Sequence, residues 1–292
     1  MTLLAEGATL RQLHTGMKWG EGPVVLPGGT CLRWTDVGSA RIHEMDLPHG
    51  AIRTIAEASD KANGQTLTRA GEVVVCVEGA RTVRIEGRFN PVVASNWSGH
   101  RFNSPNDVVE ASDRSIWFTD PPYGLMSATS EILRLGEYGG CWVFRVDGTS
   151  GVVTPVITDM EHPNGLAFSP DETLLYVADS SRLVSPTGRH HVRVYDVESG
   201  ECRNGRDFCR IESGVPDGIH VDTDGRLWCS SHGAVLVYSA TGELLETIAV
   251  PETVTNLCLD SGGTLYITTA HSLYSIATLA RPAVPVPPRR SI

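Results

Sequence analysis

The strongest constraint in this sequence is a short phrase that occurs six times. Each copy begins with a polar residue, usually followed by glycine, continues through mostly apolar residues and ends at a turn residue. The six copies occupy residues 21–29, 63–71, 106–114, 164–172, 217–225 and 255–263. A second apolar strand follows every copy, and a third follows most of them. Internal repeats of this kind determine the fold, so they must be interpreted before any local motif.

The spacing of the phrase indicates a β-propeller. The copies recur at intervals of roughly 40 to 60 residues, which suits propeller blades of four short antiparallel strands. The sequence therefore predicts an all-β, six-bladed β-propeller. The last unit, which ends near Ile276, is about one strand short. We expect the N-terminal strand at residues 8–15 to complete it and close the ring, which removes exposed sheet edges.

The same pattern sets the expected domain boundaries. Residues 1–280 are predicted to form a single propeller domain, and residues 281–292 a proline-rich tail that is extended and poorly ordered. The two longest intervals place insertions at residues 121–140 and 180–190. Long loops often carry function, so these insertions are candidates for a lid or rim over one end of the ring.

Composition limits the class of partner. The chain has 24 Lys and Arg against 34 Asp and Glu, a formal net charge of −10, which argues against nucleic-acid and anionic-membrane partners. A small-molecule ligand is expected instead. Residues 1–20 show no secretory signal pattern, and the seven cysteines include no C-x-x-C pair. We therefore expect reduced thiols in a cytoplasmic protein.

The leading residues of the six copies form a candidate site. In a propeller the innermost strands line a central channel, so these residues are expected to converge; they are Glu21, Asn63, Asn106, Asn164, Asp217 and Thr255. A ring of buried oxygen-bearing side chains is unfavourable unless something satisfies it. A hard divalent cation would do so, with the carboxylates of Glu21 and Asp217 and the amide oxygens of Asn106 and Asn164 as ligands. Alternatively, these residues only cap strand starts and turns.

Other chemical signatures are missing from the sequence. It contains no G-x-S-x-G, H-E-x-x-H, G-x-G-x-x-G or Walker A motif, which removes the common hydrolase and nucleotide-binding interpretations. His220 alternates with apolar neighbours on a predicted strand and is expected to pack rather than to act in catalysis.

Five stretches together resemble a known family. They are residues 21–23 (EGP), 101–109 (RFNSPNDVV), 118–124 (FTDPPYG), 163–171 (PNGLAFSPD) and 216–218 (PDG). From about residue 17 to 277 the chain is similar to the gluconolactonase branch of the SMP-30/gluconolactonase/luciferin-regenerating-enzyme family. That resemblance implies a six-bladed propeller with a single divalent metal at the channel mouth. The implied ligands are Glu21, Asn106, Asn164 and Asp217, the same four residues chosen above.

The resemblance also implies residues that bind substrate. Family lactonases use an Arg and an Asn to hold sugar hydroxyls, and Arg101 and Asn103 match them. Asp107 matches an acidic residue that approaches the metal in phosphotriesterase relatives. Tyr123 and Asn63 complete the set of expected substrate contacts.

The expected function is metal-dependent hydrolysis of an aldonic acid lactone, a small-molecule substrate. Asp217 is the expected general base, or alternatively a direct nucleophile. The expected metal is one Ca²⁺ ion, with Mg²⁺, Mn²⁺ or Zn²⁺ as alternatives. Two other functions stay open: hydrolysis of aryl esters or phosphotriesters at the same site, and a non-catalytic, metal-stabilised propeller that only binds a ligand.

Overall fold

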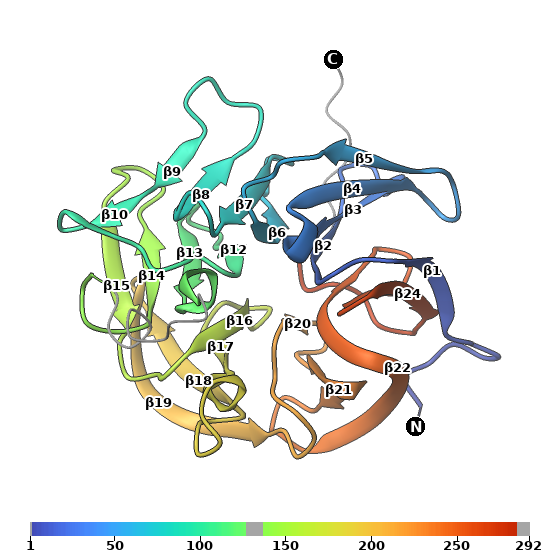
Figure 1. Cartoon of the computed structure of the whole chain (residues 1–292). Coiled ribbons are helices and arrows are strands. Elements are labelled where there is room, and N and C mark those ends of the chain that lie inside the picture. The colour runs from blue at the N-terminus through green and yellow to red at the C-terminus, as the bar shows by residue number, and fades with distance from the viewer. Residues whose placement is uncertain (1, 127–136, 285–292) are drawn as a thin grey trace.

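The computed structural model describes residues 2–126 and 137–284, which form β-sheets arranged around one central axis (Figure 1). Four of the sheets each contain four antiparallel strands in chain order. The first two contain β2 (Gly20–Val25), β3 (Cys31–Asp36), β4 (Arg41–Asp46), β5 (Ile52–Ala56), β6 (Ala62–Leu67), β7 (Val73–Val77), β8 (Thr82–Ile85) and β9 (Val92–Ala94). The next two contain β12 (Val108–Glu110), β13 (Ile116–Asp120), β14 (Trp142–Val146), β15 (Val153–Ile157), β16 (Pro163–Phe168), β17 (Leu174–Asp179), β18 (His191–Glu198) and β19 (Glu201–Arg210).

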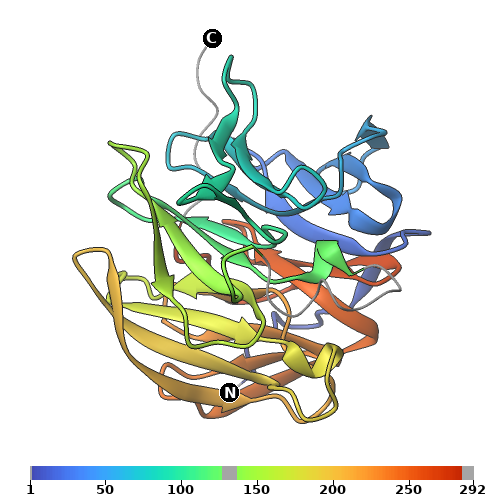
Figure 2. The same cartoon turned by 60° about the vertical axis from the view of Figure 1, so that its left-hand side comes forward.

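The remaining large sheet has six strands, in the spatial order β1, β24, β23, β22, β21, β20. These are β1 (Arg11–Thr15), β20 (Ile219–Val221), β21 (Leu227–Tyr238), β22 (Leu244–Leu259), β23 (Thr264–Thr269) and β24 (Ser272–Ala277). A short hairpin joins β10 (Asn96–Trp97) to β11 (His100–Arg101), and the 3-10 helices are η1 (Val37–Ser39), η2 (Tyr123–Leu125) and η4 (Ser181–Leu183). The sheets are twisted, so inner and outer strands cross at an angle (Figure 2).

The structure confirms an all-β propeller but corrects the number of blades: there are five, and the prediction of six separate blades is wrong. The reason is the length of β22. Its first half pairs with β21 up to Thr253, opposite His232, and its second half pairs with β23 from Val254 onwards. In the other units a loop separates the outer strand from the next inner strand. Here the chain continues in extended form, so two repeat units share one sheet.

The six copies of the phrase nevertheless end in six equivalent turns. In each turn the last residue of the phrase donates its backbone N–H to the carbonyl three residues earlier, as in Gly29 to Leu26 and Glu172 to Ser169. That last residue has a positive φ in every copy: Gly29, Gly71, Arg114, Glu172, Gly225 and Gly263. Residues with a side chain rarely adopt a positive φ, yet Arg114 and Glu172 do so here. The repeated turn therefore imposes this backbone conformation.

A second repeated device fixes the loops that lead to the inner strands. Asp36, Asp120 and Asp179 end the second strand of their sheets, and each carboxylate accepts backbone N–H groups from the loop before the inner strand of the same sheet. Asp36 accepts from Lys18 and Trp19, Asp120 from Asn103 and Ser104, and Asp179 from Glu161 and His162. These buried carboxylates hold the chain in place as it approaches the axis.

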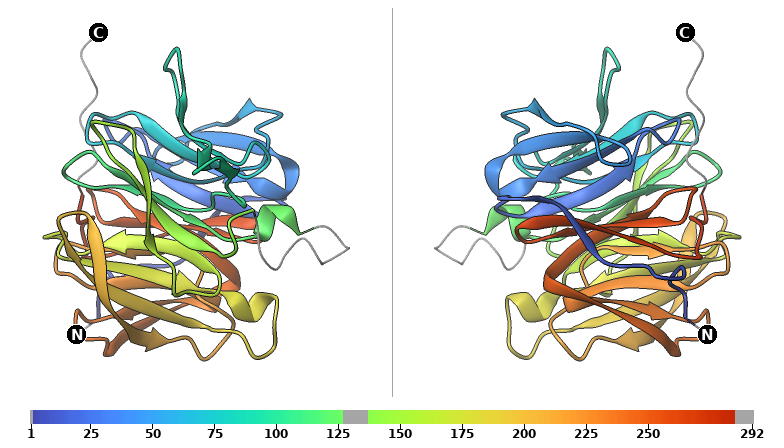
Figure 3. Two further views of the ribbon diagram at one scale, coloured as in Figure 1. Left: turned by 90° about the vertical axis from the view of Figure 1, so that its left-hand side faces the viewer. Right: turned by 90° about the vertical axis from the view of Figure 1, so that its right-hand side faces the viewer.

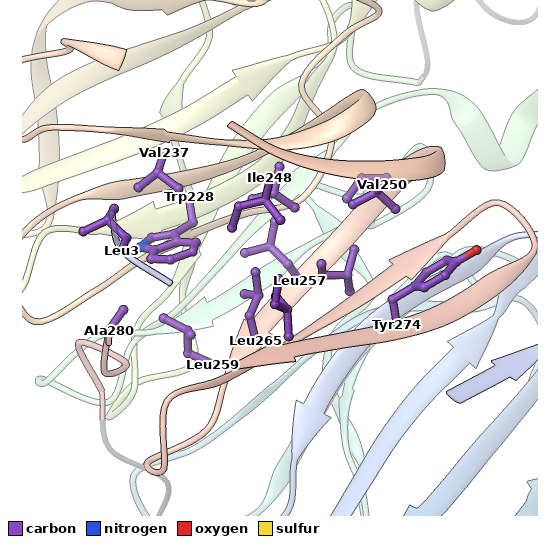
Figure 4. Packing of buried hydrophobic residues seen from close by; sticks show 14 residues of the cluster. Leu3, Trp228, Val237, Ile248, Val250, Leu257, Leu259, Leu265, Tyr274 and Ala280 are labelled. Atoms are coloured by element: carbon purple, nitrogen blue, oxygen red, sulfur yellow. The ribbon is translucent and has the colours of Figure 1, made fainter. Parts of the chain in front are cut away.

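The hydrophobic core lies mainly between neighbouring sheets. One large cluster is built on the six-stranded sheet, where Leu3 from the N-terminal segment packs with Trp228 and Ala280 (Figure 4). β1 pairs with β24, with Arg11 opposite Ser275 and Thr15 opposite Ser272. Segments from both ends of the described chain therefore stabilise the same sheet. All seven cysteines are free, and Cys31, Cys76, Cys229 and Cys258 are buried.

Part of the predicted tail is ordered against the propeller. Thr223 donates its backbone N–H to the carbonyl of Arg281 at 2.9 Å, and Ala283 donates to Val221 at 3.2 Å. Backbone hydrogen bonds thus hold residues 281–284 at the β20–β21 turn. Residues 285–292 lie outside the described residues.

The two insertions lie on one face of the propeller. η2 and η4 project from this face (Figure 3). In the second insertion, Ser181 donates to Glu161 Oε2 at 2.7 Å and Arg182 donates its backbone N–H to the carbonyl of Arg189. The first insertion is described only up to residue 126 and from residue 137, so its middle lies outside the described residues. None of the described helices is long and apolar enough to cross a membrane.

The turn between β20 and β21 supplies a test of stability. Asp222 is buried, and its carboxylate accepts from Arg226 Nε at 2.7 Å and from the buried Trp228 Nε1 at 2.8 Å. Asp222→Ala leaves the indole N–H without a partner and should lower the free energy of unfolding by about 3 kcal/mol. Asp222→Asn keeps a side-chain oxygen that can accept the indole hydrogen bond, so it should lower the free energy of unfolding by less.

Urea unfolding of the three proteins measures this difference. Asp224→Ala, in the same turn, is the matched control, because its ion pair with Arg226 is exposed and such pairs contribute about 1 kcal/mol or less. Equal losses for Asp222→Ala and Asp224→Ala would contradict the assigned role of Asp222.

Candidate functional site

The first residues of the six phrase copies form a closed ring around the axis. At three junctions a glycine N–H donates to the carbonyl of the leading residue of the next copy. These bonds run from Gly64 to Asn106 at 2.8 Å, from Gly165 to Asp217 at 3.1 Å, and from Gly218 to Thr255 at 2.7 Å. At the other three junctions side chains make the contact: Gln65 to the Gly22 carbonyl, the Leu166 backbone to the Asp107 carboxylate, and Asn256 to Glu21.

The ring is too tight for side chains at its glycine positions. A Cβ atom on Gly165 would lie 2.2 Å from the carbonyl oxygen of Asp217, and one on Gly64 would lie 2.5 Å from that of Asn106. Only glycine permits such a close approach between two backbones. The glycine that follows the leading polar residue therefore has a packing role in the ring.

Glu21 and Asp217 are two buried carboxyls that act on each other. Their exposed fractions are 4% and 8%. Burial raises the pKa of Glu21 well above its usual value, and the charge of Asp217 raises it further. Burial also raises the pKa of Asp217, with an added contribution from Asp107, while the amide of Asn164 lowers it. Negative charge at this position is unfavourable unless a positive charge compensates it.

The two asparagines of the predicted metal set lie in the same ring. Asn106 is fixed by its backbone, since its N–H donates to the carbonyl of Thr119 and its carbonyl accepts from Gly64. Asn164 Nδ2 donates to Ser180 Oγ at 3.0 Å, and Ser180 in turn donates to the carbonyl of Pro216. The structure thus brings Glu21, Asn106, Asn164 and Asp217 to one end of the axis.

This donor set is compatible with a hard cation. Two carboxylates and two amides supply oxygen ligands, which suit Ca²⁺ and Mg²⁺. Within residues 2–126 and 137–284, no three His, Cys, Asp or Glu side chains gather into a metal site, so a cation here would need the amide oxygens as well as the two acids. The repulsion between Glu21 and Asp217 supplies the electrostatic reason for a cation to bind.

Tyr123 and Arg101, two expected substrate contacts, lie on η2 and on β11. Tyr123 begins η2, and its ring packs edge-on against His162 with the centroids 5.8 Å apart. Burial raises the pKa of the Tyr123 phenol, and the charge of Asp217 raises it further. The exposed Arg101 guanidinium donates to the carbonyl of Ala80 at 3.1 Å, in the loop after β7.

Asn103 is placed inside the wall of the site. It has no exposed surface, and its Nδ2 donates to the carbonyl of Asp120, to Tyr138 Oη and to the carbonyl of Gly140, all within 3.0 Å. The protein itself uses these donors, and a contact of Asn103 with substrate hydroxyls stays a prediction. Asn103 joins the loop at residues 103–104 to the end of β13.

Asp107 lies one layer below the carboxyl pair. Burial raises its pKa to about 7, against the stabilising hydrogen bonds from Val108, Asn256 and Leu166. Asp107 and Asn256 also line the inner end of a channel of about 240 Å³ on the far side of the ring. His220 lines this channel too, and burial lowers its pKa to about 4, so a neutral His220 lies away from the mouth.

The most important residue that sequence reasoning missed is Glu78. Asn63, which was expected to contact substrate, donates its Nδ2 to Glu78 Oε1 at 2.7 Å. Glu78 is buried at the mouth, and burial raises its pKa to about 7. One signal was available: Glu78 directly follows the apolar strand Val73–Val77, near the position that carries Asp36, Asp120 and Asp179 in other sheets. Glu78 follows Asn63 by 15 residues, the same separation as between Glu21 and Asp36 and between Asn164 and Asp179.

Comparison with known proteins identifies the class of this propeller. Residues 19–271 match the model of the SMP-30/Gluconolactonase/LRE-like region. A gluconolactonase of Zymomonas mobilis is 29% identical over 308 residues, covering 94% of this chain and 83% of that protein. A pentonolactonase of Haloferax volcanii is 32% identical over 273 residues, covering 89% and 84%. A gluconolactonase structure from Xanthomonas campestris superposes with a TM-score of 0.85 at 29% identity, covering 94% and 91%.

The family match covers most of the chain and includes the ring residues described above. The chain therefore belongs to the SMP-30/gluconolactonase/LRE-like family.

The raised carboxyl pKa values predict how the cation-free protein responds to pH. The folded state holds protons that the unfolded chain releases above about pH 4, and the pKa of Asp107 is about 7. Stability should therefore fall as pH rises between these values. Asp217→Asn removes one of the repelling charges. It should raise the melting temperature at pH 8 and change it little at pH 5, where the carboxyl is largely protonated.

Thermal unfolding in the presence of a chelator, at both pH values, measures this effect. If Asp217→Asn lowers the melting temperature equally at pH 5 and pH 8, charge repulsion is not what Asp217 contributes to the folded protein.

Proposed function

We propose that this protein is a lactonase that hydrolyses a sugar lactone at the mouth of the ring. The observation that carries the proposal is the buried pair Glu21 and Asp217, in which Glu21 accepts a hydrogen bond from Asn256 and Asp217 one from Asn164. The relatives that cover most of the chain support the same reaction, since they are named gluconolactonase and pentonolactonase. An aldonic acid lactone is therefore the proposed substrate class.

The proposed cofactor is one divalent cation, with Ca²⁺ first and Mg²⁺, Mn²⁺ or Zn²⁺ as alternatives. Glu21, Asn106, Asn164 and Asp217 would hold it. When bound, such an ion polarises the lactone carbonyl as a Lewis acid and favours the ionised form of its carboxylate ligands.

Asp217 is the proposed general base. Its backbone N–H donates to Ser230 Oγ at 2.7 Å, and its carbonyl accepts from Gly165, so the residue is fixed from both sides. As a carboxylate it can accept a proton from the water that attacks the lactone carbonyl. Tyr123 and Arg101, on the rim, are proposed to orient the hydroxyl groups of the sugar.

Cation binding is tested with Glu21→Gln. This change removes one of two negative charges while keeping the shape of the side chain, so affinity for Ca²⁺ should fall by roughly tenfold or more, since ligand charge tunes calcium affinity. Isothermal titration calorimetry measures it. Glu243→Gln, in the exposed turn between β21 and β22, is the control. Unchanged Ca²⁺ affinity in Glu21→Gln would remove Glu21 from the proposed site.

The activity is tested with five- and six-membered sugar lactones in a pH-indicator assay, with each metal restored to chelated protein. Asp217→Asn should lower kcat by about 100-fold or more, as expected for loss of a general base, while the circular dichroism spectrum stays that of the folded protein. Wild-type kcat in Asp217→Asn would exclude Asp217 as the base.

The same assay separates the alternative functions. Preferential turnover of aryl esters or phosphotriesters over all lactones would favour the second hydrolase activity. If chelation unfolds the protein and no substrate is turned over with metal restored, the site is a structural one in a binding propeller.

A further inference from the structure

Glu78 is a second carboxyl at the mouth to which the proposed mechanism gives no role. It follows β7 directly, and its backbone N–H donates to the carbonyl of Lys61 at 3.0 Å. Its side chain is only 6% exposed. The hydrogen bond from Asn63 Nδ2 to Oε1 attaches this carboxyl to the leading residue of the second phrase copy. Glu78 is therefore anchored to the ring itself.

The other side of Glu78 faces η2. A Cβ atom on Gly124 would lie 2.9 Å from Glu78 Cβ and 3.1 Å from Glu78 Oε2. The backbone of η2 can therefore press against this side chain only because residue 124 is glycine. The carboxyl is fixed through Oε1, and Oε2 accepts no hydrogen bond from the described residues.

Glu78 and Asp217 approach the mouth from opposite sides. Asn63 and Asp217 lead the second and fifth of six phrase copies, so they are three steps apart around the ring. Figure 1 shows the corresponding strands, β6 and β20, facing each other across the axis. The separation is short enough for charge interaction, because Glu78 contributes to the raised pKa of Asp217, after burial and Asp107.

The surroundings of Glu78 allow it to hold a proton near neutral pH. Burial raises its pKa to about 7, against the Asn63 hydrogen bond and the charge of Lys61, which lower it. The other charged or titratable groups around it are Asp60 and Arg81 in the adjoining loops, Tyr123 beside Gly124 in η2, Cys76 on β7, and Asp217 across the mouth. A proton donor should have a pKa near the working pH.

We propose that Glu78 donates a proton to the ring oxygen that leaves when the lactone opens. This inference rests on the proposed lactone hydrolysis. The oxygen of water bonds to the carbonyl carbon, and a proton of that water passes to Asp217. The bond between the carbonyl carbon and the ring oxygen breaks, and the ring oxygen takes the Glu78 proton to become a hydroxyl. Asp217 then releases a proton and Glu78 takes one from solvent, so one water is consumed.

The opposite placement of the two carboxyls fits this division of roles. Water attacks the carbonyl carbon from one face, and the ring oxygen needs its proton at a different position on the substrate. A base and a donor on the same side of the mouth would compete for one position. Asn63 is a positioning residue in this arrangement, because it acts through its hydrogen bond to Glu78.

The first test is Glu78→Gln, with Glu243→Gln as the control. The amide retains an oxygen that can accept the Asn63 hydrogen bond, so the fold should survive, and KM should change little. The expected result is a fall in kcat for sugar lactones of about 100-fold or more. A donor must be protonated, so the wild-type rate should also fall as pH rises through the pKa of Glu78, and Glu78→Gln should lose this basic limb. A purely structural role would lower the rate equally at every pH.

A second variant keeps the proposal testable if Glu78→Gln does not fold. Asn63→Ala removes the hydrogen bond that favours ionised Glu78, so the basic limb of the pH profile should move to higher pH. An unmoved limb in Asn63→Ala, or wild-type kcat and pH profile in Glu78→Gln, would overturn the role of Glu78 while leaving lactone hydrolysis intact. If the wild-type protein opens no sugar lactone, the proposed function and this inference both fail.

Discussion

The rest of the structure depends on the close approach of six chain segments at the axis. Backbone groups alone make three of the six contacts, as between Gly64 and Asn106 or between Gly165 and Asp217, and side chains take part in the other three. Glu21 is the one leading residue whose side chain makes one of these six contacts, so the side chains of Asn106, Asn164 and Asp217 are not needed for that purpose. They can be chosen for chemistry instead. The backbone of the fold therefore brings positions 21 and 217 together, and the carboxyl side chains of Glu21 and Asp217 place negative charge there.

The buried carboxylates of this protein fall into two groups that differ in their hydrogen-bond partners. Asp36, Asp120 and Asp179 each accept two backbone N–H groups and fix the loops that lead to the inner strands. Glu21, in contrast, accepts only from Gly22 and Asn256 among the described residues and faces another acid. The first group stabilises the fold, and the second reduces stability at the mouth. Such a local conflict is what a binding or catalytic site is expected to show.

The repeat was sufficient to predict much of this arrangement. It predicted the all-β propeller and the six equivalent turns, and it placed Glu21, Asn106, Asn164 and Asp217 in one ring. It could not predict five blades, because the uninterrupted course of β22 depends on pairing with β21 and β23 rather than on a turn signal. It also could not place Asn103, whose three acceptors come from residues 120, 138 and 140. Glu78 was missed because its role depends on contacts with Asn63 and Gly124. Neither residue carries a charge, and Gly124 is distant from Glu78 in the sequence.

The far end of the axis limits how molecules can pass through the protein. Asp107 and Asn256 separate the carboxyl pair from the channel, and the other end of that channel is lined by Pro282, Ala283 and Val284. We therefore expect substrate and product to enter and leave through the mouth of the ring. The opened sugar acid must then leave the mouth before the next lactone molecule binds. The rate of product release through that face is therefore part of the rate of turnover.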